Sequence, residues 1–313
     1  MRLAIVGAGA VGRSVAELAG EYGHSVTAIA DAGGAAIDAS GLAVESVVEA
    51  KATRGTVGDE EPAAVLDATY DVLVEATPTT LGDAEPGFGH VAAALERDRH
   101  VVLANKGPVA ERYDDVMALA ADSAGEVRFE ATVGGAIPAI ATIEGIGPER
   151  VDAARGVLNG TANFILTRMA TEGLAYDQVL AEAQDLGVAE ADPSFDVEGT
   201  DAALKGTIVA NVLDGGGHAL GDATVEGITD LPTSALEVAA EDGRTIRLIV
   251  EVTDDGVRVG PRLVPEHDTL AVSNTMNIVQ FETAHAGRLN VSGRGAGGPE
   301  TASAVLADVD RLD

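Results

Sequence analysis

The chain has 313 residues and a formal net charge of −31 at pH 7, because 51 acidic residues stand against only 20 basic ones. A polyanion without a basic patch is a poor partner for nucleic acid or an anionic membrane. The lack of cysteine excludes disulfides and thiolate chemistry. No apolar run reaches the roughly 18 residues of a membrane span. With three lysines (Lys51, Lys106, Lys205) against seventeen arginines, the composition indicates a halophile-type surface on which each remaining lysine merits scrutiny.

The first thirty residues predict a strand, a glycine turn, a helix and a second strand. The strand expected over Leu3–Val6 is followed by a G-x-G-x-x-G turn, whose residues are Gly7, Gly9, Val11 and Gly12. Its glycines allow a tight turn and close approach to a pyrophosphate, which the helix N-terminus stabilises. The pattern predicts a Rossmann-like dinucleotide-binding domain. Because it begins at once, no signal peptide is evident and we expect a cytoplasmic protein.

Asp31 ends the second expected strand, nineteen residues after Gly12. An acid at this point accepts hydrogen bonds from the adenosine ribose hydroxyls and repels a 2′-phosphate, which slightly favours NAD. Lys51 and Arg54 are near enough along the chain to fold back to such a phosphate, so the choice between NAD and NADP stays open.

Two further strands are expected over Asp71–Thr77 and His100–Asn105, and each ends in a polar loop. Ligands of open α/β sheets bind beyond the carboxyl ends of the strands. We therefore expect four residues of these loops beside the cofactor, namely Thr77, Pro78, Asn105 and Lys106.

The second half predicts a mixed α+β domain. A strand is expected over Val127–Val133, helices over Tyr176–Leu186 and from about Asp201 to Leu213, and alternating strands over 246–283. The glycine-rich tail then turns helical near Pro299, so Gly295 is an expected cofactor contact. The overall expectation is an α/β protein. Its dinucleotide-binding domain covers 1–130 and is completed by 286–313, and a dimerisation and substrate domain covers 131–285.

Lys205 follows Asp201 by four residues, so the two share one helix face. A surface ion pair would permit arginine, which this chain prefers. Lysine differs in that it can give and take a proton when buried, and hydride transfer between an alcohol and a carbonyl compound requires such a group. The nearby acids Glu190 and Asp196 suggest a cationic substrate group, such as an α-ammonium.

Seven motifs, in order along essentially the whole chain, resemble those of the homoserine dehydrogenase family. They are GAGAVG (7–12), VEATPTT (74–80), ANKGP (104–108), EATVGGAIP (130–138), GVLNGTANFILTRM (156–169), GVAEADPSFDVEGTDAALK (187–205) and GRGAGGPETASAV (293–305). The resemblance implies a homodimer that interconverts L-homoserine and L-aspartate 4-semialdehyde in threonine and methionine biosynthesis. A short form is expected, without a kinase or C-terminal regulatory domain.

The resemblance also implies roles for individual residues. Lys205 and Asp201 match the catalytic pair, and Lys106 matches a lysine that contacts nicotinamide and substrate. Which of the two lysines moves the proton stays open, with Lys205 favoured and Lys106 polarising the oxygen. The expected substrate contacts are Glu190, Asp196, Gly160 and Thr161. The expected ligands of a structural Na⁺ or K⁺ ion are Glu130, Val133, Gly135 and Ile137.

Val188 departs from the family pattern, which usually has tyrosine there, so one hydroxyl is missing from the expected substrate pocket. Another amino-acid dehydrogenase, such as L-aspartate dehydrogenase, is the nearest alternative. A non-catalytic NAD(H)-binding homologue is the other, although it should have lost Lys106, Asp201 or Lys205. The six histidines show no ligand spacing, so no metal role is expected for them.

Overall fold

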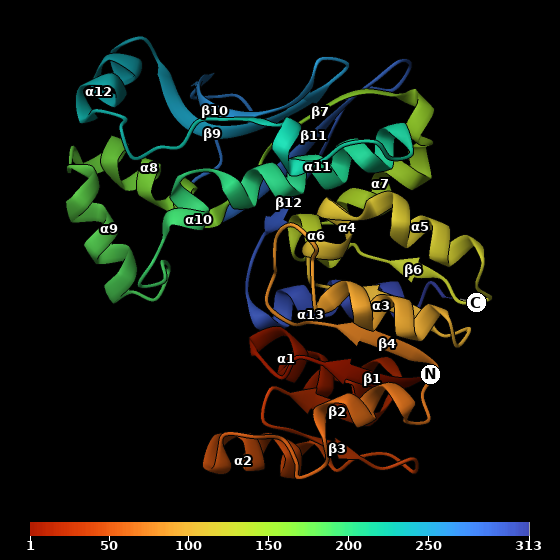
Figure 1. The fold of residues 1–313 in the computed structure, drawn as a ribbon. Helices are drawn as coiled ribbons and strands as arrows, with labels where there is room; N and C mark the ends of the chain where they lie inside the picture. The colour runs from red at the N-terminus through yellow and green to blue at the C-terminus, as the bar shows by residue number, and fades with distance from the viewer. Residues whose placement is uncertain (313) are drawn as a thin grey trace. The chain divides into compact units, whose positions relative to one another are not determined.

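The structure is a computed structural model that describes residues 1–312. The chain forms two compact units, of which the first comprises Met1–Ala136 and Gly297–Asp313 and the second comprises Ile137–Ala296. Figure 1 shows the C-terminal helix α13 (Gly298–Val309), drawn in blue, among the red and orange elements of the first unit. The chain thus leaves the first unit once and returns to it at its end.

The first unit is built on a six-stranded sheet with the order β3-β2-β1-β4-β5-β6. Its strands are β1 (Arg2–Val6), β2 (Ser25–Asp31), β3 (Gly34–Ile37), β4 (Val72–Glu75), β5 (His100–Leu103) and β6 (Val127–Arg128). All neighbours are parallel except β3, which turns back antiparallel to β2. The central strands are apolar runs with almost no exposed side chains, as expected where helices cover both faces of a parallel sheet. The expected Rossmann-like α/β architecture is confirmed.

The helices of the first unit pack on this sheet and on one another. They are α1 (Ala10–Leu18), α2 (Val44–Arg54), α3 (Gly87–Leu95), α4 (Gly107–Glu111), α5 (Tyr113–Ala121), α6 (Ala131–Gly134) and α13, with the 3₁₀ turns η1 (Ala19–Tyr22) and η2 (Pro62–Asp67). Val15 of α1 and Val305 of α13 are both fully buried in one core with Leu3 and Ile5 of β1. Helix α13 is therefore part of the core of the first unit.

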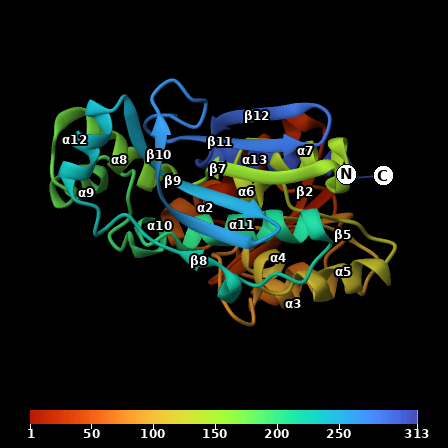
Figure 2. The same ribbon diagram turned by 90° about the horizontal axis from the view of Figure 1, so that it is seen from above.

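The second unit contains a mostly antiparallel sheet with the order β12-β11-β7-β9-β10-β8, of which β12, β11 and β7 are seen side by side in Figure 2. Its strands are β7 (Val151–Val157), β8 (Thr224–Val225), β9 (Arg244–Thr253), β10 (Gly256–Pro265), β11 (Met276–Thr283) and β12 (Gly287–Arg294). Its helices are α7 (Ala139–Ile146), α8 (Gly160–Glu172), α9 (Tyr176–Asp185), α10 (Ser194–Val197), α11 (Thr200–Asp214) and α12 (Thr233–Glu241), with the turns η3 (Pro148–Arg150) and η4 (Leu220–Asp222). The α+β character expected for this half is confirmed.

Helix α11 lies very close to this sheet because of one glycine. A Cβ atom at Gly206 would come within 2.7 Å of Val257 and 2.8 Å of Val250. No real Cβ makes such contacts, so a larger residue would push the helix away from β9 and β10. Gly206 therefore fixes the depth at which its neighbour Lys205 is held.

The other face of the second sheet carries a row of ion pairs. Side chains alternate along a strand, so Glu251 points away from the face on which α11 packs. Four ion pairs cross five strands on this side: Arg288–Glu282 (3.1 Å), Arg155–Glu282 (3.3 Å), Arg155–Glu251 (3.6 Å) and Arg262–Glu251 (3.0 Å). All of these side chains are a quarter to a half exposed. The row gives this face a polar, partly hydrated surface.

The structure corrects one expected element and adjusts the ends of others. The strand expected over Val127–Val133 is wrong beyond Arg128, because Ala131–Gly134 forms the helical turn α6. The backbone N–H of Glu130 donates to the buried carboxylate of Asp308 (2.8 Å). Within residues 1–312, no helix combines the length and the apolar character needed to cross a bilayer.

Candidate functional site

Lys205 lies on α11 with its ammonium group buried between two oxygen atoms. Its Nζ atom donates to Oδ2 of Asp201 at 2.7 Å and to the backbone carbonyl of Leu158 at 2.6 Å. The side chains of Lys205 and Asp201 are only 10% and 9% exposed. An ammonium has three N–H groups, so one remains for an acceptor outside these two contacts. The helical spacing expected from the sequence brings this pair together.

Asn159 joins this pair to the start of α8. Its Oδ1 accepts the backbone N–H of Ala162 at 2.8 Å, which is the normal hydrogen bond of an N-cap asparagine. Its Nδ2 donates to Asp201 Oδ2 at 2.9 Å and to Asp196 Oδ1 at 2.6 Å. One buried amide therefore holds two carboxylates at the N-terminus of a helix, where negative charge is favoured.

The expected substrate contacts fall into two groups. Gly160 and Thr161 follow Asn159 directly in the chain, and Asp196 is hydrogen-bonded to its side chain. Thr161 donates through Oγ1 to the carbonyl of Val188 at 3.2 Å. Glu190 is exposed, and its backbone carbonyl accepts from the side chain of Gln184 at 3.1 Å. The structure thus gathers the first three about Asn159 and leaves the carboxylate of Glu190 toward solvent.

The glycine turn after β1 has the shape that a pyrophosphate requires. A Cβ at Gly12 would lie 1.8 Å from the carbonyl oxygen of Gly7, and a Cβ at Gly7 would lie 2.3 Å from that of Ala76. Gly7 also has a φ of 104°, which disfavours other residues. At Gly9, the N-cap of α1, a Cβ would meet nothing within 4 Å. Two glycines are thus required by close packing, and the third faces open space at a helix N-terminus.

Asp31 ends β2 as expected, but the protein itself uses its carboxylate fully. Oδ1 accepts from Gly33 N (2.7 Å), Gly34 N (3.0 Å) and Thr56 Oγ1 (3.1 Å), and Oδ2 accepts from Lys51 Nζ (2.7 Å) and Val57 N (3.1 Å). Burial alone would raise the pKa of Asp31, but hydrogen bonds from Lys51, Gly33 and Thr56 outweigh it and hold the pKa below its usual value. Asp31 therefore links the segments beside it through these hydrogen bonds.

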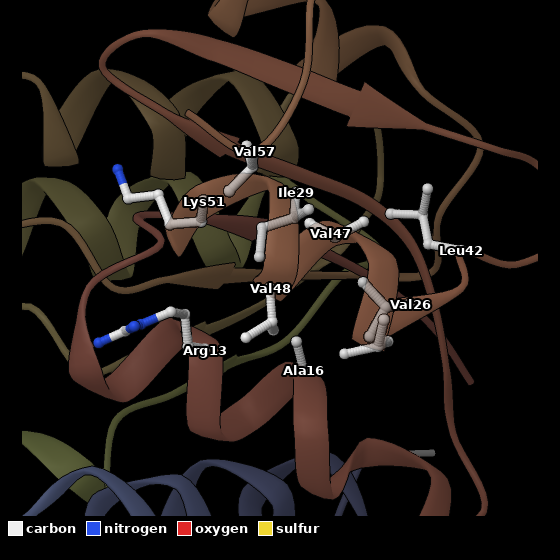
Figure 3. Close-up of a pocket in the computed structure, with 10 residues that line it drawn as sticks. Arg13, Ala16, Val26, Ile29, Leu42, Val47, Val48, Lys51 and Val57 are labelled. Atoms are coloured by element: carbon white, nitrogen blue, oxygen red, sulfur yellow. The ribbon is translucent and has the colours of Figure 1, made fainter. Parts of the chain in front are cut away.

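Lys51 lies beside an apolar pocket between α1, β2 and α2. Eight of the ten residues that line this pocket are apolar, and the other two are Lys51 and Arg13. Figure 3 shows the side chains of Lys51 and Arg13 extending to the same side, away from Val26 and Leu42. Arg54 points elsewhere, because its guanidinium pairs with Asp59 at 3.0 Å.

The loops after β4 and β5 are held together at the carboxyl ends of these strands. Asn105 Nδ2 donates to Thr77 Oγ1 at 3.1 Å, and the backbone N–H of Lys106 donates to Thr79 Oγ1 at 3.4 Å. Asn105 is almost completely buried, whereas Pro78 is exposed. The structure therefore brings Thr77, Asn105 and Lys106 together, as expected from their places after parallel strands.

Gly295 and the expected cation ligands lie elsewhere in the chain. Gly295 belongs to the second unit, where a Cβ would clash with the side chain of Asn277. Glu130, Val133 and Gly135 belong to the first unit and Ile137 to the second. The carbonyls of Glu130 and Ile137 accept backbone N–H groups at 3.3 and 2.8 Å.

Sequence reasoning missed three polar residues at these sites: Asn159, Glu75 and Arg13. Asn159 carried a recognisable signal, because asparagine directly before a helical run is a favoured N-cap. Glu75 is a carboxylate at the end of the otherwise apolar strand β4, which is itself unusual in a buried parallel strand. Arg13 gave no signal, since its place beside Lys51 depends on how α1 and α2 pack.

Comparisons with known proteins agree with this geometry. Residues 138–309 match the family model described as Homoserine dehydrogenase. Residues 1–183 also match the model described as Glutamate/Leucine/Phenylalanine/Valine dehydrogenase. The second match covers the Met1–Ala136 part of the first unit and reaches only as far as α9, so it leaves the helix that carries Lys205 outside.

Relatives that align along nearly the whole chain decide between these two. The homoserine dehydrogenase of Methanocaldococcus jannaschii is 39% identical, over 99% of this chain and 97% of its own length. The NAD(+)-dependent homoserine dehydrogenase of Pseudomonas canavaninivorans is 34% identical, over 98% and 95%.

Solved structures give the same result. A candidate homoserine dehydrogenase of Archaeoglobus fulgidus is 40% identical with a TM-score of 0.92, over 99% of this chain and 98% of its own. A hyperthermophilic archaeal homoserine dehydrogenase in complex with NADPH is 28% identical with a TM-score of 0.86, over 99% and 96%. The chain therefore belongs to the homoserine dehydrogenase family.

Proposed function

We propose that this NAD(P)-dependent oxidoreductase interconverts L-homoserine and L-aspartate 4-semialdehyde with Lys205 as the group that moves the proton. The observation that carries this assignment is the burial of the Lys205 ammonium between Asp201 and the Leu158 carbonyl, with one N–H left over. A lysine that served only as a surface charge would be exposed to solvent. Arginine is the basic residue that this chain uses at most positions.

The dinucleotide supplies the hydride acceptor or donor when bound, and the protein supplies the proton transfer. In homoserine oxidation, the neutral amine of Lys205 takes the hydroxyl proton as hydride leaves the carbon. In the reverse direction, its ammonium returns that proton to the forming alcohol. Asp201 fixes the position of Nζ, and Asn159 holds Asp201 in turn. Lys106 is assigned to polarise the reacting oxygen.

The substrate contacts follow from the same arrangement. Asp196 and Glu190 are assigned to the substrate ammonium, and the hydroxyl and backbone of Thr161 and Gly160 to its carboxylate. Helix α8 begins at Gly160, so its unpaired N–H groups favour an anion there. The Thr161 hydroxyl donates its one hydrogen to the Val188 carbonyl at 3.2 Å, so it must exchange this contact to donate to the substrate carboxylate.

The cofactor residues proposed in the first unit are Gly7, Gly9, Val11, Gly12, Asp31, Thr77, Pro78, Asn105 and Lys106, with Gly295 from the second. The cradle at Gly9 supports pyrophosphate binding. One relative is named as NAD(+)-dependent and another is solved with NADPH. Relatives are thus described with both NAD⁺ and NADPH.

The bonding of Asp31 alters the reasoning on cofactor choice. Five protein donors already use its carboxylate, and Lys51 balances its charge. The slight preference for NAD expected from an unpaired acid therefore loses its basis. With Arg13 beside Lys51, we propose that the adenosine end admits a ribose 2′-phosphate and that the enzyme uses NADP as well as NAD.

Three broader assignments complete the proposal. A structural Na⁺ or K⁺ ion is assigned to the loop of Glu130, Val133, Gly135 and Ile137, whose oxygen atoms suit a hard ion. A homodimer, a cytoplasmic setting and a requirement for high salt are proposed from the family resemblance and the charge of −31. Analytical ultracentrifugation at several salt concentrations tests the dimer and its salt dependence together.

The proposed function is tested by assaying the purified protein in concentrated KCl or NaCl for homoserine-dependent reduction of NAD⁺ and NADP⁺. We expect turnover with both cofactors, and a loss of turnover in Lys205→Ala without loss of dinucleotide binding. If the protein binds the dinucleotide but leaves homoserine unchanged at every salt concentration, the proposed activity is wrong. L-Aspartate with the same cofactors then tests the alternative of another amino-acid dehydrogenase.

A further inference from the structure

Glu75 is the most deeply buried carboxylate among the described residues, and the reaction above gives it no role. It is the last residue of β4, and its side chain has no exposure at all. Removing an ionised group from water is costly unless it is fully hydrogen-bonded. Because β4 is otherwise apolar, the position of Glu75 points to the groups to which it is hydrogen-bonded.

Three donor groups and one histidine ring nitrogen contact the two oxygen atoms of Glu75. Oε1 accepts from the backbone N–H of Thr77 (3.0 Å), from the Thr77 hydroxyl through a very short contact, and from Asn105 Nδ2 (3.3 Å). Oε2 lies 2.7 Å from Nδ1 of His90, a residue of α3 whose side chain is 20% exposed. A carboxylate offers about four acceptor positions, so Glu75 is saturated.

These contacts link three separate elements to the carboxylate of Glu75. They are the loop after β4, the loop after β5 and the helix α3. There is little room for these parts to shift, since a Cβ at Gly87 would lie 2.5 Å from Asn105 Nδ2 and a Cβ at Gly107 would lie 2.5 Å from the carbonyl of Thr80. A change in the position of Asn105 therefore moves the backbone of Lys106 as well.

We propose that Glu75 and His90 form a positioning pair that holds Thr77 and Asn105 in the geometry that binds the dinucleotide. This inference rests on the proposed function, in which these two loops form part of the cofactor site. Glu75 acts as the common acceptor, and His90 donates from Nδ1 and so keeps the carboxylate turned toward both loops. Neither residue touches the reacting atoms, so both act through Thr77 and Asn105.

A side chain with two acceptor oxygen atoms fits this position, because three of the groups around it are donors and His90 Nδ1 is assigned as the fourth. Glutamine at this position has the same shape, but its amide nitrogen would face either His90 or the Thr77 and Asn105 donors. With Nδ1 of His90 protonated, at least one buried donor would lose its partner, and the loops would have to separate to admit water. The expected consequence is weaker cofactor binding.

The test compares Glu75→Gln with Asp71→Asn, a matched change at the opposite end of the same strand. Asp71 precedes β4 and bonds Arg2 at 2.6 Å, away from the carboxyl end of the strand. We expect Glu75→Gln to raise the Kd for NADH and the KM for the cofactor by about tenfold or more. The KM for homoserine should stay within about twofold of wild type, and Asp71→Asn should leave both cofactor constants unchanged.

Two substitutions of His90 separate positioning from simple packing. His90→Asn places an amide N–H near the site of Nδ1, whereas His90→Leu fills the space and removes the donor. We expect the asparagine variant to keep the NADH Kd within about threefold of wild type and the leucine variant to weaken it about tenfold. A thermal melt of each variant shows that it is folded at the assay temperature.

The outcomes distinguish this inference from the proposed function. If folded Glu75→Gln binds NADH as tightly as wild type and shows only a lower melting temperature, the pair is merely structural and the inference is wrong. It is equally wrong if His90→Asn and His90→Leu weaken binding by the same factor. Failure of the wild type to oxidise homoserine overturns the proposed function instead, because NADH binding is measured without turnover.

Discussion

Two of the three lysines form ion pairs with aspartate at the same distance, yet their surroundings differ. Lys205 lies 2.7 Å from Asp201 and Lys51 lies 2.7 Å from Asp31. The Lys205 side chain is 10% exposed, and the pair shares one helix. The Lys51 side chain is 28% exposed, and its pair joins helix α2 to the end of β2.

The difference shows that the ion-pair distance does not reveal the role of a lysine, whereas the other partners do. Asp31 accepts four further hydrogen bonds from neighbouring loops, so its carboxylate is a structural centre and Lys51 covers it. The Lys205 amine donates to Asp201 and to the Leu158 carbonyl and is buried, whereas the Lys51 amine donates to Asp31 and to the Gly55 carbonyl and is more exposed. One pair organises the loops of the fold, and the other holds a group that can exchange a proton.

The largest expected effect comes from removing each amine. Lys205→Ala should lower kcat for homoserine oxidation by about 10²–10⁴-fold, because general acid–base catalysis contributes that much. Lys51→Ala should change kcat with NAD⁺ by less than about threefold, since this lysine touches no reacting atom. Steady-state kinetics of the two variants, at a saturating concentration of each substrate, measures the contrast. Equal losses in kcat would refute the division of roles between the two pairs.

A smaller effect is expected when the partner carboxylate is neutralised. Asp201→Asn keeps the shape of the side chain but removes the charge that holds the Lys205 ammonium. We expect kcat to fall by about tenfold to a hundredfold, with the Kd for NADH unchanged. The two values come from turnover assays and fluorescence titration. An unchanged kcat would show that Asn159 and Leu158 position Lys205 without Asp201.

The Lys51 pair is expected to act on the choice of cofactor. Lys51→Gln removes the cation beside the adenosine end, whereas Lys51→Arg keeps it. The glutamine variant should raise the KM for NADP⁺ about tenfold, and the arginine variant by less than about threefold, with little change for NAD⁺ in either. The measurement is the ratio of kcat/KM for the two cofactors. A ratio unchanged in Lys51→Gln would place the 2′-phosphate elsewhere.

The smallest effect is expected at an ion pair far from both. The bidentate hydrogen bonds from Arg2 lower the pKa of Asp71 to about 2, against the opposing effect of burial. A carboxylate whose pKa is lowered on folding stabilises the fold above its unfolded pKa, near 3.9, and loses that effect as the pH falls toward about 2. Asp71→Asn should therefore lower the melting temperature by about 1–3 °C at pH 7. The difference from wild type should shrink between pH 4 and 2, as thermal melts at each pH would show.

The sequence predicted most where one local pattern was sufficient. The turn at Gly7–Gly12 and the helical spacing of Asp201 and Lys205 each depend on a few neighbouring residues, and the structure contains both. The fold class and the family were confirmed because motifs in the right order constrain the whole chain. The assigned roles of the site residues remain predictions that the experiments above test.

The rest depended on contacts between distant segments. The bonding of Asp31 by Lys51, Thr56 and Val57 cannot be seen from a strand-end acid alone, because its partners lie twenty or more residues away. The error in the strand predicted beyond Arg128 has a similar cause. The backbone N–H of Glu130 donates to Asp308, which lies 178 residues further along the chain. Glu75 shows the same limit, as its partners His90 and Asn105 become neighbours only after two strands pair.

The most direct test of the account is kcat for homoserine oxidation by Lys205→Arg, measured beside wild type in the same concentrated salt. Arginine keeps the positive charge and the hydrogen-bonding capacity, but its guanidinium does not release a proton in proteins. We predict that the variant binds NADH normally and loses at least about a hundredfold in kcat. A variant that retains kcat within about threefold of wild type would contradict the assignment of proton transfer to Lys205.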